Sequence, residues 1–289
     1  MSVEETATEK QTPAGWILIL LGLVLVIFPI FWIISTSLKS IGEWVTYPPI
    51  FVPERLAVEN YLSIFTGGSL GGGLVARVPN VTKSVIDSAI CSVGGTALSI
   101  IVGLLAAFGI ARHRIGGEFF PIFLLSARMA PPIVAAIPLL ILYSIIGLVD
   151  THIGLILAYA CFTLPYSTWM IASFIEEIPR DLEEAAQVDG MSTLETHFKV
   201  TLPLIKGGIA ATALFIFILN WSEFLLALTL THEKVLTIPV QIKAFFTYSG
   251  QLYGPQSAFG IIAIIPLIVF SLIIQRHLVR GLTFGAIKG

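Results

Sequence analysis

The ionisable residues inside long apolar stretches are the side chains of this sequence that could do chemistry. Arg128 is followed closely by Pro131 and Pro132, and Glu223 lies three residues after Asn220. A charge near the centre of a membrane helix costs about 2.5–3.5 kcal/mol on insertion scales, so such residues usually line a pathway for a polar solute or an ion. The pattern therefore indicates binding and passage rather than bond cleavage.

Pro131 and Pro132 predict a break in the helix that contains Arg128. Each proline removes a backbone donor and clashes with the preceding turn. Unpaired backbone groups are tolerated in a membrane only where they are buried in protein or line a cavity. We therefore expect these three residues to form a wall of a translocation pathway. The alternative is a structural kink in which a neighbouring carbonyl satisfies Arg128.

A second polar patch contains Asn220, Trp221 and Glu223. Residues three apart share a helix face, so we expect this patch to line the same pathway, with Asn220 as a hydrogen-bond donor and Trp221 as a stacking plate for a sugar. The alternative is an interfacial aromatic residue beside a satisfied amide. Arg128 and Glu223 could also face each other, although the rise per residue puts Glu223 nearer the outer surface by about 5–10 Å.

These residues lie in a chain whose composition is that of a membrane protein. Of its 289 residues, 56% are hydrophobic and 12% charged, and the net charge of −2 gives no electrostatic case for binding nucleic acid. A membrane-spanning helix needs about 20 mostly apolar residues. Six stretches meet that length and predict an all-α, polytopic membrane protein with six transmembrane helices: residues 16–38, 84–111, 118–147, 153–175, 205–230 and 257–279.

The distribution of lysine and arginine predicts that both termini are cytoplasmic, because these residues are more frequent in cytoplasmic flanks. We expect a cytoplasmic tail at residues 1–15, a six-helix transmembrane domain at 16–279 and a second cytoplasmic tail at 280–289. Within the domain, residues 39–83 form a periplasmic loop and residues 178–204 a cytoplasmic loop.

The second apolar stretch has a small residue at every fourth position, which predicts a smooth ridge where another helix can approach closely. These residues are Gly95, Ser99, Gly103, Ala107 and Ala111.

The loop at residues 178–204 reads as two short helices joined by a turn. Pro179 suits a first helical position and Gly190 a left-handed stop. Ser192 and Glu195 form a capping box, and Pro203 opens the fifth span. Its apolar residues could dock a partner or pack within the loop, and the pattern alone leaves both open: Leu182, Ala185, Ala186, Met191, Leu194 and Phe198.

The same segment resembles the EAA loop of ATP-binding-cassette importer permeases, through Glu184-Ala185-Ala186, Asp189-Gly190, Phe198 and Leu202-Pro203-Leu204. Further motifs resemble the carbohydrate-uptake branch of the maltose type: Ser37-Leu38-Lys39, Arg128-Met129-Ala130-Pro131-Pro132, Gly147-Leu148-Val149-Asp150-Thr151, Trp221-Ser222-Glu223-Phe224 and Val279-Arg280-Gly281-Leu282-Thr283. The similarity covers essentially all of the chain after residue 15. Met191 stands where the family usually has alanine, which could slightly alter the fit to the ATPase. Ser222 stands where it usually has asparagine, in the possible substrate region, which weakens any transfer of substrate specificity.

The resemblance implies the type I importer permease fold in a bacterial inner membrane. It implies a second homologous permease, two ATPase subunits that bind Mg-ATP, and a periplasmic solute-binding protein. This chain would move a sugar or sugar derivative and would itself bind no cofactor or metal; it contains no GxxxxGK[ST] sequence. The residues that the resemblance places in coupling to the ATPase are Glu183, Glu184, Ala185, Ala186, Asp189, Gly190, Phe198 and Pro203.

Two other classes of protein compete with this interpretation. A secondary transporter driven by an ion gradient would need carboxylates on an ion path, for which Asp87 and Glu223 are the plausible candidates. A membrane-bound enzyme would need a catalytic cluster, but the five histidines are scattered over both predicted faces and form no HExxH sequence.

Overall fold

The computed structural model describes residues 13–68, 70, 77–117, 119–127, 131–248 and 250–285. The chain divides into two compact units, one drawn from residues 1–80 and 245–262 and the other from residues 81–244 and 263–289.

The first unit contains a long apolar helix and an ordered cap. Within the cap, the side-chain amide of Asn60 donates to the carbonyl oxygens of Ser37 and Lys39, each at 2.9 Å. The predicted 39–83 loop thus contains ordered elements. The elements of this unit are α1 (Pro13–Ser37), η1 (Ile41–Glu43), α2 (Glu59–Thr66), the antiparallel pair β1 (Phe246–Thr247) and β2 (Gly250–Gln251), and the start of α13 (Tyr253–Gly285).

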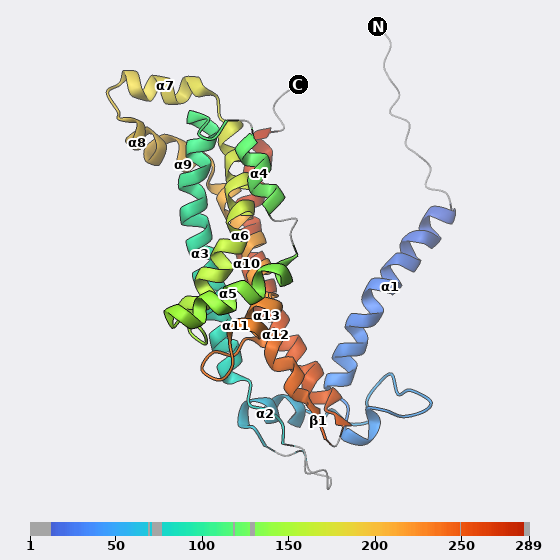
Figure 1. The fold of residues 1–289 in the computed structure, drawn as a ribbon. Helices are drawn as coiled ribbons and strands as arrows, with labels where there is room; N and C mark the ends of the chain where they lie inside the picture. Colours follow the sequence, from blue (N-terminus) through green and yellow to red (C-terminus); the bar gives the residue numbers. More distant parts are fainter. Residues whose placement is uncertain are drawn as a thin grey trace. The chain divides into compact units, whose positions relative to one another are not determined.

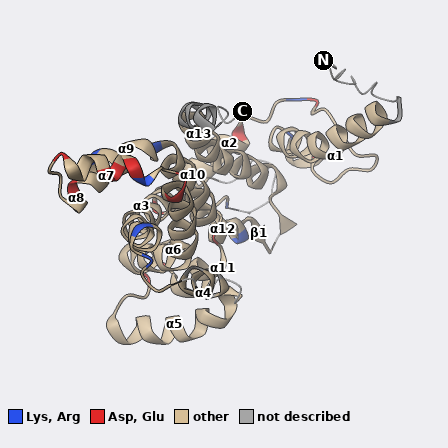
Figure 2. Cartoon of the chain, turned by 90° about the horizontal axis from the view of Figure 1, so that it is seen from above, with Lys and Arg blue, Asp and Glu red and all other residues tan. Residues whose placement is uncertain are grey.

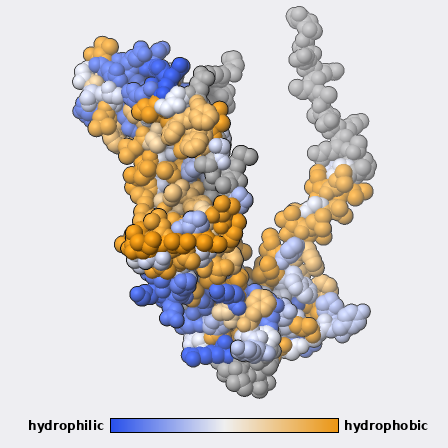
Figure 3. Space-filling model, in the orientation of Figure 1, coloured by the Kyte–Doolittle hydropathy of each residue, from blue (hydrophilic) through white to orange (hydrophobic). Residues whose placement is uncertain are grey.

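The second unit is helical, and α7, α8 and α9 lie at one end of α3 (Figure 1). Hydrophobic side chains cover the visible sides of its long helices, whereas hydrophilic ones gather at α7 and α8 (Figure 3). Its elements before the continuation of α13 are α3 (Thr82–His113), α4 (Phe119–Ala127), α5 (Pro132–Ile146), α6 (His152–Glu176), α7 (Arg180–Val188), α8 (Thr193–Thr196), η2 (His197–Thr201), α9 (Leu202–Leu204), α10 (Lys206–Trp221), α11 (Leu225–Leu230) and α12 (Ile238–Gln241), with η3 (Ile242–Phe245) following α12.

The predicted ridge of small residues on α3 is confirmed, since all five of its members are buried. It packs against α6, where the hydroxyl of Ser99 lies 3.0 Å from that of Ser167. Ser167 also donates to the carbonyl of Ser99 at 2.9 Å. Gly103 lies beside this pair without a side chain to separate the helices. Close approach along the ridge makes α3 and α6 the central packed pair of the unit.

Four described helices are long and apolar enough to cross a membrane: Gly15–Ser37, Thr82–His113, His152–Glu176 and Tyr253–Gln275. They correspond to the predicted first, second, fourth and sixth spans. A bent pair, Thr193–Leu204 with Lys206–Trp221, could provide a fifth. The count of six spans therefore stays a prediction.

The third and fifth predicted spans are not single helices. The 118–147 stretch contains two, α4 and α5, and the second begins at Pro132 as the paired prolines require. In the 205–230 stretch, α10 ends at Trp221 and α11 begins at Leu225. Glu223 accepts from the backbone N–H of Leu226 at 3.0 Å, so its carboxylate caps the start of α11 and stabilises the break.

Candidate functional site

The first loop helix, α7, begins directly after a proline. Pro179 is the N-cap residue, with φ −57° and ψ 131°, and Arg180 is the first helical residue. The expectation that Pro179 would occupy the first helical position is therefore wrong by one residue, because its ψ is extended. Asp181 and Glu183 lie in the first turn, where carboxylates interact favourably with the helix dipole.

The turn after α7 agrees with the sequence prediction. Gly190 has a φ of +94°, which glycine adopts readily because it lacks a Cβ and which other residues rarely adopt. Ser192 and Glu195 form the predicted capping box: Oγ of Ser192 accepts from the N–H of Glu195 at 3.3 Å, and Oε2 of Glu195 accepts from the N–H of Ser192 at 3.1 Å. That backbone donor, with Lys199, lowers the pKa of Glu195 to about 2, so the carboxylate stays charged at physiological pH.

The second half of the loop continues from α8 through the wider π-type turn η2 into α9. Pro203 lies in α9, and the helical axis then bends by 74° before α10. Pro203 thus precedes the fifth predicted span across a bend rather than opening a straight helix.

The predicted coupling residues divide between two faces of the loop. Glu184, Ala185 and Asp189 are exposed, whereas Glu183 and Ala186 are buried. Phe198 is 46% exposed. The exposed set, together with Leu182 and Leu194, forms a surface that a partner could reach. Acidic and basic residues gather on α7, on α8 and in the segments next to α9, whereas α5 has none (Figure 2).

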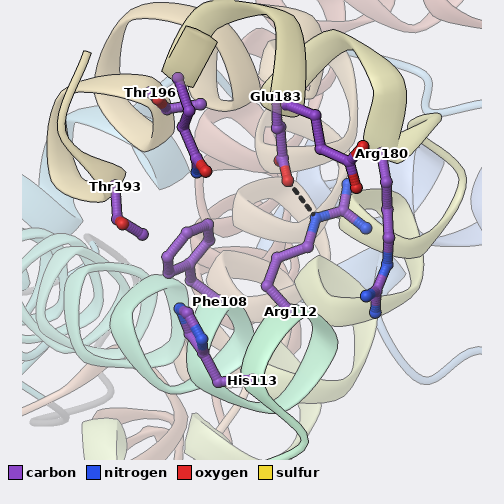
Figure 4. Close-up of a pocket in the computed structure, with 9 residues that line it drawn as sticks. Phe108, Arg112, His113, Arg180, Glu183, Thr193 and Thr196 are labelled. Carbon is purple, nitrogen blue, oxygen red and sulfur yellow. Dashed lines mark ion pairs between the residues drawn. The ribbon is translucent and has the colours of Figure 1, made fainter. Parts of the chain in front are cut away.

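Glu183 is held inside the protein rather than presented to a partner. Its Oε2 lies 2.7 Å from Nε of Arg112, which comes from the C-terminal end of α3 (Figure 4). Its Oε1 accepts from the hydroxyl of Thr201 at 2.6 Å. The side chains of Arg112 and Glu183 are 7% and 10% exposed, so this is a buried ion pair. Sequence reasoning counted Arg112 only as a flanking positive charge.

An aromatic contact joins the second half of the loop to the same end of α3. The rings of Phe108 and His197 have centroids 3.7 Å apart. His197 is 1% exposed, and burial lowers its pKa, an effect that the charge of Glu183 opposes. Neither ring nitrogen of His197 has a hydrogen-bond partner among the described residues. No sequence motif marked either residue.

A pocket of about 150 Å³ lies between α3 and the loop helices (Figure 4). Its lining combines charged, amide, hydroxyl and aromatic side chains: Phe108, Arg112, His113, Arg180, Glu183, Glu184, Gln187, Thr193 and Thr196. The pocket is thus lined both by exposed residues of α7, Glu184 and Gln187, and by the buried pair that holds the loop, Arg112 and Glu183.

The candidate pathway residues of α10 are mostly packed inside the unit. Asn220 is 2% exposed and donates to the hydroxyl of Thr96 at 3.2 Å. Trp221 is 4% exposed and donates through Nε1 to the carbonyl of Ala263 at 2.9 Å. Glu223 is half-buried at the α10–α11 break. Of the three, only Glu223 reaches a surface on this chain.

The other candidate pathway residues lie between α4 and α5. Arg128 is outside the described residues, so its pairing with Glu223 stays a prediction. Pro131 is the exposed N-cap residue of α5 and Pro132 its first residue.

Two carboxylates organise the opposite end of α3. Asp87 lies 2.6 Å from Nζ of Lys83 and 2.8 Å from Nε2 of His152, and it also accepts from the N–H of Leu236. These bonds give Asp87, one of the two candidates for an ion path, a structural role.

Asp150 accepts hydrogen bonds from four consecutive backbone N–H groups, those of residues 232–235, at 2.9–3.1 Å. The residue lies in the turn between α5 and α6, and its bonds fasten the segment after α11 to that turn. Sequence reasoning noted Asp150 only as part of a family motif.

Within the described ranges, no group of three or more His, Cys, Asp or Glu residues is placed to hold a metal ion.

Comparison with known proteins gives one family and consistent relatives. The family model for the binding-protein-dependent transport system inner membrane component matches residues 99–284. The chain is 37% identical over 268 residues to the trehalose transport system permease protein SugB of Mycobacterium tuberculosis, covering 91% of this chain and 93% of that protein. It is 32% identical over 280 residues to the trehalose/maltose transport system permease protein MalG of Thermococcus litoralis, covering 94% and 97%.

Among solved structures, the chain resembles one from a crystal structure of a bacterial ABC transporter involved in the import of the acidic polysaccharide alginate. The TM-score is 0.72 at 21% identity, and the match covers 91% of this chain and 94% of that one. At this identity the likeness establishes the fold.

Proposed function

The chain belongs to the family of binding-protein-dependent transport system inner membrane components, and from that premise we propose that it carries a sugar or sugar derivative from the periplasm to the cytoplasm. It is a multi-pass membrane permease subunit of an ABC importer, a transport component whose ATPase is a separate subunit. The proposal of a sugar rests on one observation: a relative 37% identical over 91% of this chain is a trehalose permease.

The partners follow from the family. Its importers work with an ATPase and a substrate-binding protein. We further propose two ATPase copies, which bind the Mg-ATP, and a second homologous permease beside this one. The sequence of this chain contains no P-loop, so the energy has to come from another polypeptide.

The proposed ATPase dock is the exposed face formed by α7, α8 and η2. It offers a carboxylate at Glu184, a small residue at Ala185 and apolar side chains at Leu194 and Phe198. Closure of the ATPase subunits would displace this face and thereby switch access to the cavity from one side of the membrane to the other. Such coupling requires contacts that differ between the two states.

The proposed pathway lies between this chain and the second permease. Ser222 is exposed and Glu223 half-buried at the α10–α11 break. Polar groups at membrane depth are tolerated where protein or a water-filled cavity covers them. A partner permease facing this break would cover these groups with protein and enclose a water-filled cavity beside them.

The proposed orientation places α7 to α9 and both termini in the cytoplasm. It is supported by the excess of lysine and arginine in the flanks on that side. It also puts the charged loop helices where a cytoplasmic ATPase can reach them (Figure 2).

The test is reconstitution of the complete complex in proteoliposomes with labelled trehalose or maltose as first probes. We expect uptake that requires ATP and the binding protein. Glu184→Lys should abolish uptake and stimulated ATPase activity while the complex still assembles, and Glu177→Lys, a matched change at an exposed residue before α7, should preserve both. Gradient-driven uptake by this chain without an ATPase would contradict the proposal.

The sugar itself is best identified on the cognate binding protein. A thermal-shift screen of di- and oligosaccharides should show one class that raises the melting temperature. The same sugar should then stimulate ATP hydrolysis by the complete complex. A binding protein that responds only to amino acids or metal ions would refute the proposed substrate class.

A further inference from the structure

Two adjacent carboxylates of α7 differ in burial, although both line the pocket between α7 and α3. Glu184 is exposed, as a contact with a partner requires, whereas Glu183 is 8% exposed and bonded within the chain. Although the family resemblance groups the two together, their surroundings give them separate tasks. The question is what Glu183 does for the loop.

The partner of Glu183 is the last-turn arginine of α3. Besides the 2.7 Å ion pair, Nη2 of Arg112 donates to the carbonyl of Ile178 at 3.0 Å. The guanidinium therefore contacts both the entry to the loop and its first helix. A planar guanidinium with several fixed donors is suited to such a double contact, and a lysine is not.

Glu183 also joins the two halves of the loop. Its second oxygen accepts from the hydroxyl of Thr201 in η2, while the ring of Phe108 in α3 contacts that of His197 in the same element, at an interplanar angle of 39°. The ion pair, the hydrogen bond and the ring contact thus fasten both halves of the loop to one end of α3. A loop held in this way cannot be displaced without α3.

We propose that Arg112 and Glu183 are positioning residues that fix the coupling loop on α3, so that displacement of α7 moves α3 and its packed neighbour α6 together. The inference rests on the proposed coupling to an ATPase. Removing one member of a buried ion pair leaves the other charge uncompensated, whereas well-packed apolar replacements of both are often tolerated for stability. The pair is therefore explained better by fixing a geometry than by stability alone.

The experiment is a charge swap in the complete reconstituted complex. Arg112→Glu and Glu183→Arg should each reduce the stimulation of ATP hydrolysis by sugar-loaded binding protein about tenfold or more, within the usual range of coupling between sites. The double swap should recover part of that loss, because the opposite charges again meet. Glu183→Gln, which keeps the shape and the acceptor for Thr201, should give an intermediate loss if the single swaps do not assemble.

The control is an exposed ion pair in the same loop. Lys199 lies 3.2 Å from Glu195, and their side chains are 61% and 49% exposed. Lys199→Ala should leave stimulation within about twofold of wild type, since exposed pairs contribute little. Co-purification of the ATPase with each variant separates loss of coupling from loss of docking.

The outcomes are distinct. Wild-type stimulation in both single swaps and in Glu183→Gln would overturn the inference, and so would independent effects of the two swaps in a double-mutant cycle. If the wild-type complex itself shows no ATP-dependent sugar uptake, the proposed function fails instead. An active wild type that Glu184→Lys inactivates, together with additive swaps, would refute only the positioning role.

Discussion

Gly103 of α3 lies so close to Ser167 of α6 that a methyl group added to its Cα would be 2.4 Å from Oγ of Ser167 and 3.2 Å from the backbone nitrogen of Thr168. Because one of these atoms belongs to the backbone, a change of the Ser167 rotamer alone could not relieve the crowding. Since Ser167 is also bonded to Ser99, the close approach of the helices and their hydrogen bonds depend on the same glycine.

Gly103→Ala should therefore destabilise the protein by about 1–3 kcal/mol, the usual cost of overpacking a well-packed contact. The measurement is the thermal unfolding midpoint of the purified complex in detergent. Gly22→Ala is the matched control, because a Cβ at Gly22 in α1 meets no atom within 4 Å. Equal midpoints for the two variants would show that the helices are not limited by this contact.

Asn220→Ala should lower stability without changing which sugar the complex prefers. Its amide is 2% exposed and donates to Thr96, so the substitution removes a buried hydrogen bond worth about 0.5–1.5 kcal/mol. The measurement is the unfolding midpoint together with competition between sugars for uptake. A change in the order in which the variant prefers sugars would indicate that Asn220 contacts the substrate.

Features set by neighbours in the sequence were predictable. The capping box needs only Ser192 and Glu195, the turn needs only Gly190, and the ridge on α3 needs only a regular spacing. Each is a local rule of backbone geometry or side-chain size, and each appears in the structure. Two prolines differ from expectation: Pro179 lies one residue before the helix, because adjacent cap positions differ in ψ alone, and Pro203 precedes the fifth span across a bend.

Features set by distant partners were not predictable. Nothing near Glu183 indicates that Arg112 lies against it or that the residue turns away from the exposed face. The 74° bend before α10 and the contact of Phe108 with His197 in η2 likewise left no signal in the local sequence. A family motif identifies the residues of a loop but does not say which of their side chains are exposed and which are buried against the rest of the protein.

Asp150→Asn should loosen the segment at residues 232–235. The substitution replaces an acceptor oxygen with a donor facing backbone N–H groups, and asparagine tolerates the φ of +58° at this position as well as aspartate does. Amide exchange at residues 232–235 should become faster, as measured by mass spectrometry. Glu233→Gln, a neutralising change within the 232–235 segment that keeps its backbone N–H, should leave the exchange unaltered.

The effect of Asp150 should not depend on pH near neutrality. Burial raises the pKa of this carboxyl, but the four backbone donors lower it below its ordinary value. A group whose pKa is lowered in the folded state contributes fully above its unfolded value of about 3.9 and loses that contribution as the pH falls through the folded value. The protection of the amides of residues 232–235 against exchange should thus be constant from about pH 8 to 5. A loss of protection within that window would contradict the assigned pKa direction.

Gly190→Val should impair coupling through the backbone rather than by crowding. A Cβ at Gly190 would meet no atom within 4 Å, yet its φ of +94° is one that a β-branched residue disfavours by about 1–3 kcal/mol. The turn between α7 and α8 would then relax to a negative φ and change the angle at which the two helices present the exposed face. Uptake and stimulated ATP hydrolysis should fall together, while basal hydrolysis by the ATPase is retained. Gly190→Asn should reduce uptake and stimulated hydrolysis less, since asparagine adopts positive φ more readily than valine. Equal activity of the two variants would mean that the conformation of the turn does not govern coupling.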